Sequence, residues 1–391
     1  MDILFLEEDS CSADLLPFTS TRSVLDIRMG ILTFREKWER LLGPAGFRLL
    51  APAATSAQPP QPASTQAPAG SFAQPPQTAS ADRPPTAPLP TGTALPANLL
   101  PTPETAGSIR EALKQGPLTP AIAKDILSQS TLIQYPWFIF LHNAEALIAD
   151  FTLLTAGRKT QPIPASVQAI SPEGIFIEEG ARLQHCLLNA SAGPIYIGHN
   201  AEIMEGSLIR GPFAACEGAT VKMGTKIYGA TTLGPHCTAG GEIKNVVFFG
   251  YSNKGHDGYL GDSVIGEWCN LGAGTSASNL KNTASDVKVW HPATGRYSNA
   301  GLKCGLLMAD YSRSAINTSF NTGTVVGVCC NVFGETIPPK YIPDFSWGAH
   351  HRYEWDNALR DIGNWKKLKN QFLNDGEINT LKHIFEPSNS L

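Results

Sequence analysis

His256 stands in a sequence context that favours chemistry. It lies within Lys-Gly-His-Asp-Gly, residues 254–258, between two glycines. An imidazole accepts and releases a proton near neutral pH, so this side chain suits a general base. The glycines and a break in the surrounding sequence pattern predict a loop, and loops on a rigid scaffold often carry function. The alternative is a histidine with a purely structural role.

Other reactive residue types form no comparable constellation. The eight cysteines are scattered, with no C-x-x-C pair and no accompanying histidine pattern. We therefore predict no metal site, and interpret the cysteines as buried thiols of a protein in the reducing cytoplasm.

A period of six residues predicts the scaffold that positions these side chains. Aliphatic or small residues recur at this spacing, and the pattern returns after residue 260 and again after residue 300. The first run comprises Ile197, Ile203, Ile209, Ala215, Val221, Ile227, Leu233 and Ala239. A helix would need a period of 3.6 and an ordinary strand a period of 2. The six-residue period is typical of a hexapeptide β-helix, whose short strands stack as coils around an interior.

The rest of the chain differs from the repeat. Residues 1–50 begin with an apolar strand-like run, and 51–103 are rich in Pro and Ala with Asp82 and Arg83 as the only charges. Such a composition predicts a disordered linker. Helical periodicity follows over 104–165 and returns over 350–386, where it predicts a cap on the end of the solenoid.

Composition excludes several classes of partner. The net charge is −4 and no basic run stands out, which argues against a nucleic-acid-binding protein. No window approaches 18 apolar residues, so no membrane span is expected, and the acidic start does not read as a signal peptide.

Residues 242–280 carry the motifs EIK, SNKGH, YLGD-x-x-IG and N-x-GAGT-x-x-x-N. In this order and spacing they resemble the acetyltransferase domain of the bifunctional N-acetylglucosamine-1-phosphate uridylyltransferase/glucosamine-1-phosphate N-acetyltransferase family. LLPFT-x-TR, GILT-x-REKW, FNTGTVVGV and FSWG resemble a Bacteroidetes-type variant of that family. The resemblance implies a left-handed β-helix, a member of the hexapeptide acyltransferase superfamily.

The same resemblance implies roles for individual residues. It makes His256 the general base and Asn279 its catalytic neighbour at the reacting amine. The residues implied to bind the sugar phosphate are Lys244, Tyr259, Asn270 and, one position out of register, Lys226. Ala273 and Gly334 would line the acetyl-CoA channel. The family's second phosphate-side lysine has no match, although Lys281 or Lys288 could substitute, and the basic residue that meets the CoA phosphates has no clear counterpart.

The N-terminal half fits the family less well. Sugar nucleotidyltransferases open with a strand and a G-x-G-T-R loop, whose backbone approaches the nucleotide phosphates. Here no glycine precedes Gly30, and only Thr21-Arg22 echoes the end of that loop. We expect a reduced docking module. A surviving uridylyltransferase, which would need Mg²⁺, is the alternative.

Together these observations predict a mainly β protein: a left-handed parallel β-helix with a small, reduced α/β N-terminal module and a C-terminal helical tail. The predicted divisions are a nucleotidyltransferase-like remnant (1–50), a linker (51–103), the α-rich remainder of the module (104–165), the acyltransferase β-helix (170–345) and the tail (350–386). The expected function is acetyl-CoA-dependent N-acetylation of an amino-sugar phosphate in UDP-N-acetylglucosamine synthesis, by a cytoplasmic homotrimer with no nucleic-acid or membrane partner. The alternatives are a bifunctional enzyme that keeps nucleotidyl transfer, and a non-catalytic trimeric scaffold or sugar-nucleotide sensor.

Overall fold

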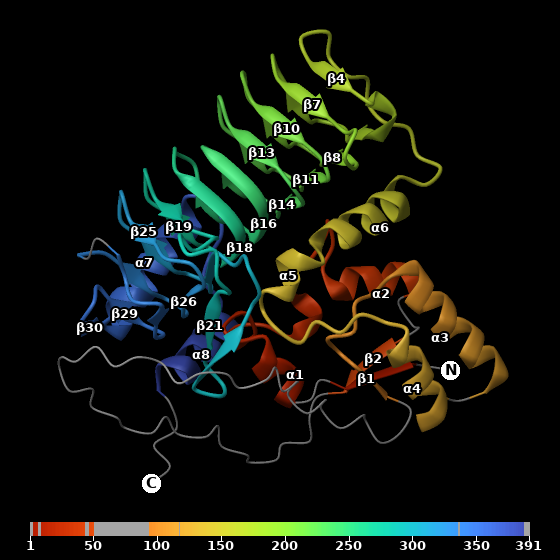
Figure 1. Ribbon diagram of the computed structural model, residues 1–391, viewed down its shortest axis with the longest axis horizontal. Coiled ribbons are helices and arrows are strands. Elements are labelled where there is room, and N and C mark those ends of the chain that lie inside the picture. The colour runs from red at the N-terminus through yellow and green to blue at the C-terminus, as the bar shows by residue number, and fades with distance from the viewer. Residues whose placement is uncertain are drawn as a thin grey trace.

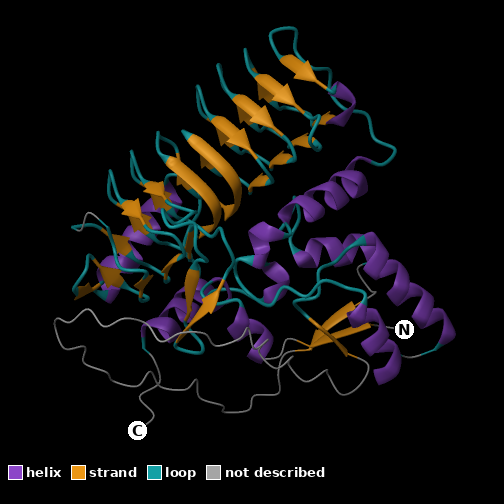
Figure 2. Ribbon diagram, viewed as in Figure 1, coloured by secondary structure: helices purple, strands orange, loops and turns teal. Residues whose placement is uncertain are grey.

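The computed structural model describes residues 3–6, 9–43, 47–50, 94–116, 118–334 and 337–386 (Figure 1). A tapering stack of short strands forms the body of the molecule, with helices along one side and at one end (Figure 2). In the described part of the chain, no helix is long and apolar enough to cross a membrane.

The N-terminal unit combines a small parallel sheet with helices. Strand β1 (Ile3–Leu6) lies between β2 (Phe47–Leu50) and β3 (Ala94–Pro96). Helix α2 (Phe34–Leu42) begins at a capping box, in which the Thr33 side chain accepts from the Glu36 N–H and the Glu36 carboxylate from the Thr33 N–H. The other helices are α1 (Asp9–Asp14), α3 (Pro103–Gln115), α4 (Pro120–Ser128), α5 (Phe138–Leu141) and α6 (Asn143–Thr155).

The linker expected over 51–103 falls largely on residues 51–93, which lie outside the described residues. Its last ten residues differ from that expectation. β3 pairs with β1, and Leu95, Leu99 and Leu100 are buried in the core of the N-terminal unit. Apolar residues resume at Leu95, and these residues have a sheet edge and a core to pack on, unlike the Pro/Ala-rich stretch before them.

The solenoid has three faces of stacked parallel strands, which we call A, B and C in chain order. Face A comprises β4 (Gln168–Ile170), β7 (Leu187–Asn189), β10 (Leu208–Arg210), β13 (Lys226–Tyr228), the first parts of β16 (Glu242–Gly250) and β18 (Tyr259–Glu267), β20 (Ser276–Ala277) and β25 (Ser319–Phe320). Face B comprises β5 (Ile175–Ile177), β8 (Ile195–Ile197), β11 (Phe213–Ala215), β14 (Thr231–Leu233), the second parts of β16 and β18, β23 (Leu306–Met308), β26 (Thr324–Val326) and β28 (Tyr341–Ile342). Face C comprises β6 (Arg182–Leu183), β9 (Glu202–Ile203), β12 (Thr220–Val221), β15 (Thr238–Ala239), β17 (Asn253–Lys254), β19 (Asn270–Leu271), β24 (Arg313–Ser314), β27 (Asn331–Val332) and β29 (Ser346–Trp347), which ends in an antiparallel pair with β30 (His351–Arg352).

The predicted interior positions are buried, and the repeat continues where the sequence pattern seemed to stop. Ile243, Phe248, Lys254 and Leu260 follow one another as inward-facing residues through 243–260. Their spacing changes because one turn is short and because β16 and β18 run across the corner between faces A and B. The predicted fold class, a mainly β parallel β-helix with a reduced α/β module and a helical tail, is confirmed.

The N-terminal unit packs against the outer side of face B. Val247, Val264, Leu307 and Val325 point away from the prism and join the core that contains Phe18. A hairpin of β21 (Lys288–His291) and β22 (Arg296–Asn299) leaves the solenoid between β20 and β23, and it contributes further side chains to that core. Face B is therefore an internal surface of the molecule.

The tail helices cover a corner of the prism, so the prediction that they cap its end is wrong. α7 (Trp355–Lys367) and α8 (Asp375–Phe385) pack against the turns that join face B to face C. Trp268, Tyr311 and Phe345 at this corner share a core with Ile362 and Leu381. Face A and the edge that joins face C to face A carry exposed apolar side chains, among them Leu208, which is 49% exposed.

Candidate active site on the open edge of the solenoid

The turns that join face C to face A form an edge, which we call the open edge. Five of these turns have four residues each: 204–207, 222–225, 255–258, 272–275 and 315–318. The turn between β15 and β16 has only Gly240 and Gly241. Two residues are therefore missing from one layer of the edge, and a notch opens directly above the turn that carries His256.

The notch is a cavity of about 530 Å³, within the size range of small-molecule sites. His256 is exposed in it, with Asp257 beside it. The lining residues are Lys222, Met223, Gly240, Gly241, Gly255, His256, Asp257, Ala273, Gly274, Ile316 and Asn317. A proton acceptor, a cation at Lys222 and apolar side chains at Met223 and Ile316 thus share one hollow.

Glycine is required where the His256 turn stacks on the short turn. A Cβ on Gly240 would lie 2.7 Å from the carbonyl carbon of Gly255, and one on Gly241 would lie 2.9 Å from the carbonyl oxygen of His256. These backbone contacts hold the His256 main chain against the short turn and leave its side chain outside the six-residue register, as predicted.

Tyr259 and Asn279 meet on the outer side of face A, next to the His256 turn. A Cβ on Gly261 would fall 2.3 Å from the Tyr259 hydroxyl and 2.9 Å from the Asn279 amide nitrogen. Gly261 thus leaves the space in which these two polar groups sit. Burial and the charge of nearby Asp262 raise the pKa of Tyr259, so its hydroxyl remains a hydrogen-bond donor at neutral pH.

The carboxylate of Asp262 fixes this pair. It is buried, and it accepts from Asn279 Nδ2 at 2.5 Å and from Asn245 Nδ2 at 2.7 Å. Asn279 is therefore oriented by an acid that the sequence analysis did not single out. Asp262 is the last residue of the YLGD motif, but the spacing of the motif does not show whether this acid is buried or lies on the surface.

Two predicted phosphate ligands follow on neighbouring coils of face A. Lys244 is the cross-strand neighbour of Gly261 and so lies beside the Tyr259 hydroxyl. Lys226 is one coil farther, paired with Glu242, and it is exposed. Neighbouring strands are about 4.8 Å apart, so both amines can reach one phosphate over this face.

The Tyr228 hydroxyl donates to Glu242 at 2.6 Å. That hydrogen bond and burial raise the pKa of Tyr228 to about 12. Glu242 and Tyr228 thus form a fixed polar pair between the two lysines.

The remaining predicted ligands are not in the same cluster. Asn270 lies on face C, paired with Asn253 and Arg313, and so across the open edge from Lys244 and Tyr259. Ala273 lines the cavity, and its carbonyl accepts from the Asn317 N–H at 2.7 Å. Gly334 follows β27 on the same edge, beyond the residues that line the cavity.

The two substitute lysines lie elsewhere. Lys281 donates to the Asp286 carbonyl in the loop before the hairpin, and Lys288 is exposed on β21. Four residues that line the cavity were not predicted from the sequence: Lys222, Met223, Ile316 and Asn317. Their positions in turns of four residues would have predicted the open edge, but only the short turn at 240–241 makes them line a cavity.

The residues that echo a nucleotide-binding loop face the solenoid. Thr21 Oγ donates to the Asp310 carboxylate at 2.5 Å, and Arg22 forms ion pairs with Asp310 and, at 3.2 Å, with Glu267. Burial alone would lower the pKa of Arg22, but the two carboxylates outweigh it and the pKa is raised. Lys37 is likewise buried, with its ammonium 2.7 Å from both oxygens of Asp150. No group of three His, Cys, Asp or Glu side chains that could hold a metal occurs within the described ranges.

Residues 3–159 match the sugar nucleotidyl transferase family. A bifunctional protein GlmU from Cyanothece sp. is 25% identical over 214 residues, covering 49% of this chain and 46% of that protein. A bifunctional sugar-1-phosphate nucleotidylyltransferase/acetyltransferase from Sulfurisphaera tokodaii is 34% identical over 92 residues, covering 24% and 23%.

Among solved structures, the UDP-N-acetylglucosamine acyltransferase from Campylobacter jejuni aligns with 57% of this chain and 96% of its own, at 12% identity and a TM-score of 0.26. The chain spans about half the length of the Cyanothece relative and less of the other. The sequence matches confirm the resemblance to the bifunctional uridylyltransferase/acetyltransferase family.

Proposed function

We propose that the protein is an acetyl-CoA-dependent N-acetyltransferase that acts on an amino-sugar phosphate such as glucosamine 1-phosphate. One observation carries the proposal: the short turn at 240–241 opens a cavity onto His256, and Tyr259, Lys244 and Asn279 lie on the adjoining face. A base, phosphate-binding cations and a fixed amide side by side suit acyl transfer to a phosphorylated amine. The names of the matched relatives support the same activity.

The proposed reaction needs a single proton acceptor. The sugar amine attacks the thioester carbonyl carbon of acetyl-CoA, so a C–N bond forms and the C–S bond breaks. His256 takes the proton that the amine loses and passes it to the departing CoA thiolate. Asn279, held by Asp262, orients the amine, and Lys244 with Lys226 binds the sugar phosphate. Ala273 in the cavity and Gly334 farther along the edge are the proposed backbone contacts of acetyl-CoA.

We also propose a homotrimer in which face A meets neighbouring subunits. Face B is covered by the N-terminal unit, whereas face A exposes Ile170 and Leu208, and Met223 and Ile316 are each 69% exposed on the open edge. Contact between subunits along this edge would bring Asn270 of one subunit toward the Lys244 cluster of another. The eight buried cysteines suit the cytoplasm, where UDP-N-acetylglucosamine synthesis would use the product.

Nucleotidyl transfer is the second candidate, favoured by the family match of residues 3–159. Against it, Thr21, Arg22 and Lys37 are engaged with Asp310 and Asp150. We propose that the N-terminal unit braces the solenoid. Mg²⁺ would be needed only if nucleotidyl transfer survives, and a non-catalytic trimeric scaffold is the remaining alternative.

The test is acetyl-CoA-dependent thiol release with a panel of amino-sugar phosphates, followed for two variants. His256→Ala should lower kcat by about 10²–10⁴-fold with little change in KM, because removal of a positioned base costs that much. Lys244→Ala should mainly raise the KM for the sugar phosphate. Sedimentation should show the wild-type oligomer in both variants.

His199→Ala is the matched control, since His199 is also exposed on a solenoid turn but lies far from the cavity. It should keep wild-type kinetics. The proposal fails if wild-type protein releases no thiol with any amino sugar, which would favour the scaffold, or if His256→Ala keeps more than about a tenth of kcat.

A further inference from the structure

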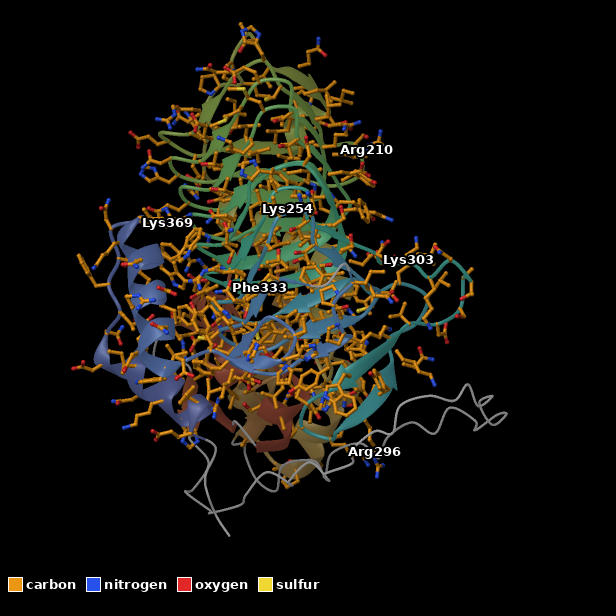
Figure 3. The ribbon with its side chains drawn as sticks, turned by 90° about the vertical axis from the view of Figure 1, so that its left-hand side faces the viewer. Arg210, Lys254, Arg296, Lys303, Phe333 and Lys369 are labelled. Carbon is orange, nitrogen blue, oxygen red and sulfur yellow. The ribbon has the colours of Figure 1, made fainter. Side chains whose placement is uncertain are left out.

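One lysine lies inside the solenoid. The inward positions of face C are occupied by Leu183, Ile203, Val221, Ala239, Lys254, Leu271, Ser314 and Val332. Lys254 is 1% exposed, and it is the only charged side chain at an inward strand position of the described coils. Figure 3 shows it in the middle of the stack, whereas Lys369 and Arg210 lie at the periphery.

The ammonium of Lys254 ends at backbone carbonyls. Its Nζ donates to the His256 carbonyl at 2.8 Å and to the Gly240 carbonyl at 3.1 Å. No carboxylate lies within ion-pair distance of it among the described residues, and the nearest acid that affects it is Asp257 of the same turn. An aliphatic residue would pack the interior without burying a charge, so a lysine at this position calls for a functional reason.

The other four-residue turns of the open edge show what this lysine replaces. Each of them ends in a residue with a hydroxyl group: Ser207, Thr225, Thr275 and Thr318. Thr225 Oγ donates to the Lys222 carbonyl at 2.5 Å, and Thr318 Oγ donates to the Ala315 carbonyl at 2.8 Å. Thr225 and Thr318 thus close their own turns. Ser207 and Thr275 instead donate to the first carbonyl of the turn on the next coil, at Lys222 and Ala315.

The His256 turn cannot use this device. The corresponding residue is Gly258, whose φ of +119° disfavours any side chain, and a Cβ there would lie 2.1 Å from the Thr275 carbonyl oxygen. Lys254 supplies the missing bond from inside the prism. It binds the carbonyl of the histidine itself and ties it to the short turn at Gly240.

We propose that Lys254 is a positioning residue of the acetyl-transfer site, whose buried amine clasps the His256 peptide and so keeps the imidazole directed into the cavity. The predicted effect on kinetics rests on the proposed function, whereas the contact between the Lys254 amine and the His256 carbonyl does not depend on it. Loss of the amine should release the peptide group between His256 and Asp257. A variant that keeps an apolar chain next to Ala239 removes the amine without removing the packing of the lysine stem.

The variant that tests this is Lys254→Met, which keeps the stem length and removes the donor. It should lower kcat at least tenfold, leave the KM for the sugar phosphate within about twofold, and leave the melting temperature at or above that of the wild type. Ile203→Ala is the control, because it alters the same interior stack three coils away. It should lower the melting temperature and leave kcat unchanged.

A double variant separates positioning from other roles. In the His256→Ala background, Lys254→Met should cause no further loss, because the lysine acts through the histidine. Lys254→Gln, a neutral donor, should recover part of the kcat lost in Lys254→Met. A second full loss of rate in the His256→Ala background would overturn the proposal.

Amide hydrogen exchange gives a readout without catalysis. The amides of residues 255–258 should exchange at least tenfold faster in Lys254→Met than in wild-type protein, and Ile203→Ala should not change them selectively. If exchange rises but no amino sugar is acetylated by the wild type, the proposed function fails and the clasp stands. If the amide exchange rates of residues 255–258 are the same in Lys254→Met as in wild-type protein, the proposed positioning role is wrong, whatever the kinetics.

Discussion

A charged side chain inside an apolar prism gives the protein a pH dependence at a single residue. Burial lowers the pKa of Lys254 from 10.5 to about 8. Between these two values the unfolded chain binds more protons than the folded one, so the contribution of this lysine to stability rises with pH. At neutral pH the residue is charged in both states, and the full cost of its burial is present.

We therefore predict that the difference in unfolding free energy between wild-type protein and Lys254→Met changes with pH. Between pH 7 and pH 10 it should move in favour of the wild type by an amount on the order of 3 kcal/mol, since each pKa unit is worth about 1.4 kcal/mol. Urea unfolding of both proteins at several pH values measures this difference, and other titrating groups cancel between them. A difference that stays constant over this range would mean that the amine is not buried in its charged form.

For individual residues, the sequence predicts catalytic candidates better than it predicts the buried residues that hold them in place. His256 was identified because it lies outside the six-residue register between glycines. Lys254 was not, because a lysine inside a β-helix breaks the aliphatic pattern and looks like a loss of register. Asp262 was overlooked for a similar reason, since only the folded corner shows its carboxylate turned toward Asn279 and Asn245.

At the scale of elements, the cavity depends on the length of one turn. Neighbouring turns of four residues stack along the open edge, and the two-residue turn at Gly240 and Gly241 leaves a gap between them. A period of six predicts the coils but gives no information on the length of each individual turn. The irregularity that makes the site therefore appears in the sequence only as a shift of register, from Ala239 to Ile243.

Lengthening this turn should close the site. Insertion of Ser-Asn between Gly240 and Gly241 restores the four-residue length of the neighbouring turns, which the solenoid already accommodates. We expect the protein to fold as a β-helix with acetyl transfer reduced at least tenfold, because the inserted residues occupy the space above His256. Steady-state kinetics and circular dichroism measure the two effects.

The same dipeptide inserted after Gln371, in the exposed connection between α7 and α8, serves as the control and should leave the kinetics unchanged. If the lengthened 240–241 turn supports wild-type kcat and KM, the cavity is not where the reaction occurs.

At the scale of the whole molecule, the N-terminal unit and the solenoid are joined by a buried ion pair. The Asp310 carboxylate accepts hydrogen bonds from the Thr21 hydroxyl, from the Arg22 guanidinium and, at 2.7 Å, from the Glu267 N–H. The Arg22 guanidinium also lies 5.1 Å from the centre of the Phe249 ring. The threonine and arginine predicted to echo the end of a nucleotide-binding loop thus join the N-terminal unit to the solenoid. The sequence pattern singles out this pair of residues, but only the packing shows that their partners belong to the solenoid.

This arrangement predicts that Arg22→Ala acts on stability. Removal of one partner leaves Asp310 buried and unpaired, which should cost about 3–5 kcal/mol in the free energy of unfolding. Arg35→Ala is the matched control, since the Arg35–Asp26 pair is partly exposed and should contribute about 0–1 kcal/mol. The combined variant Arg22→Met with Asp310→Leu should recover part of the loss, because neither charge of this pair remains buried, although Thr21 and the Glu267 N–H lose their acceptor.

Arg22 also distinguishes a structural role of the N-terminal unit from a nucleotide-binding role. Wild-type protein incubated with UTP, Mg²⁺ and a sugar 1-phosphate should form no UDP-sugar, because Arg22 and Lys37 are already bound to Asp310 and Asp150 and cannot also hold a triphosphate without breaking buried pairs. Pyrophosphate release measured alongside urea unfolding tests both expectations on one sample. UDP-sugar formation that disappears in Arg22→Ala, with stability unchanged, would make Arg22 a nucleotide ligand and the protein a bifunctional enzyme.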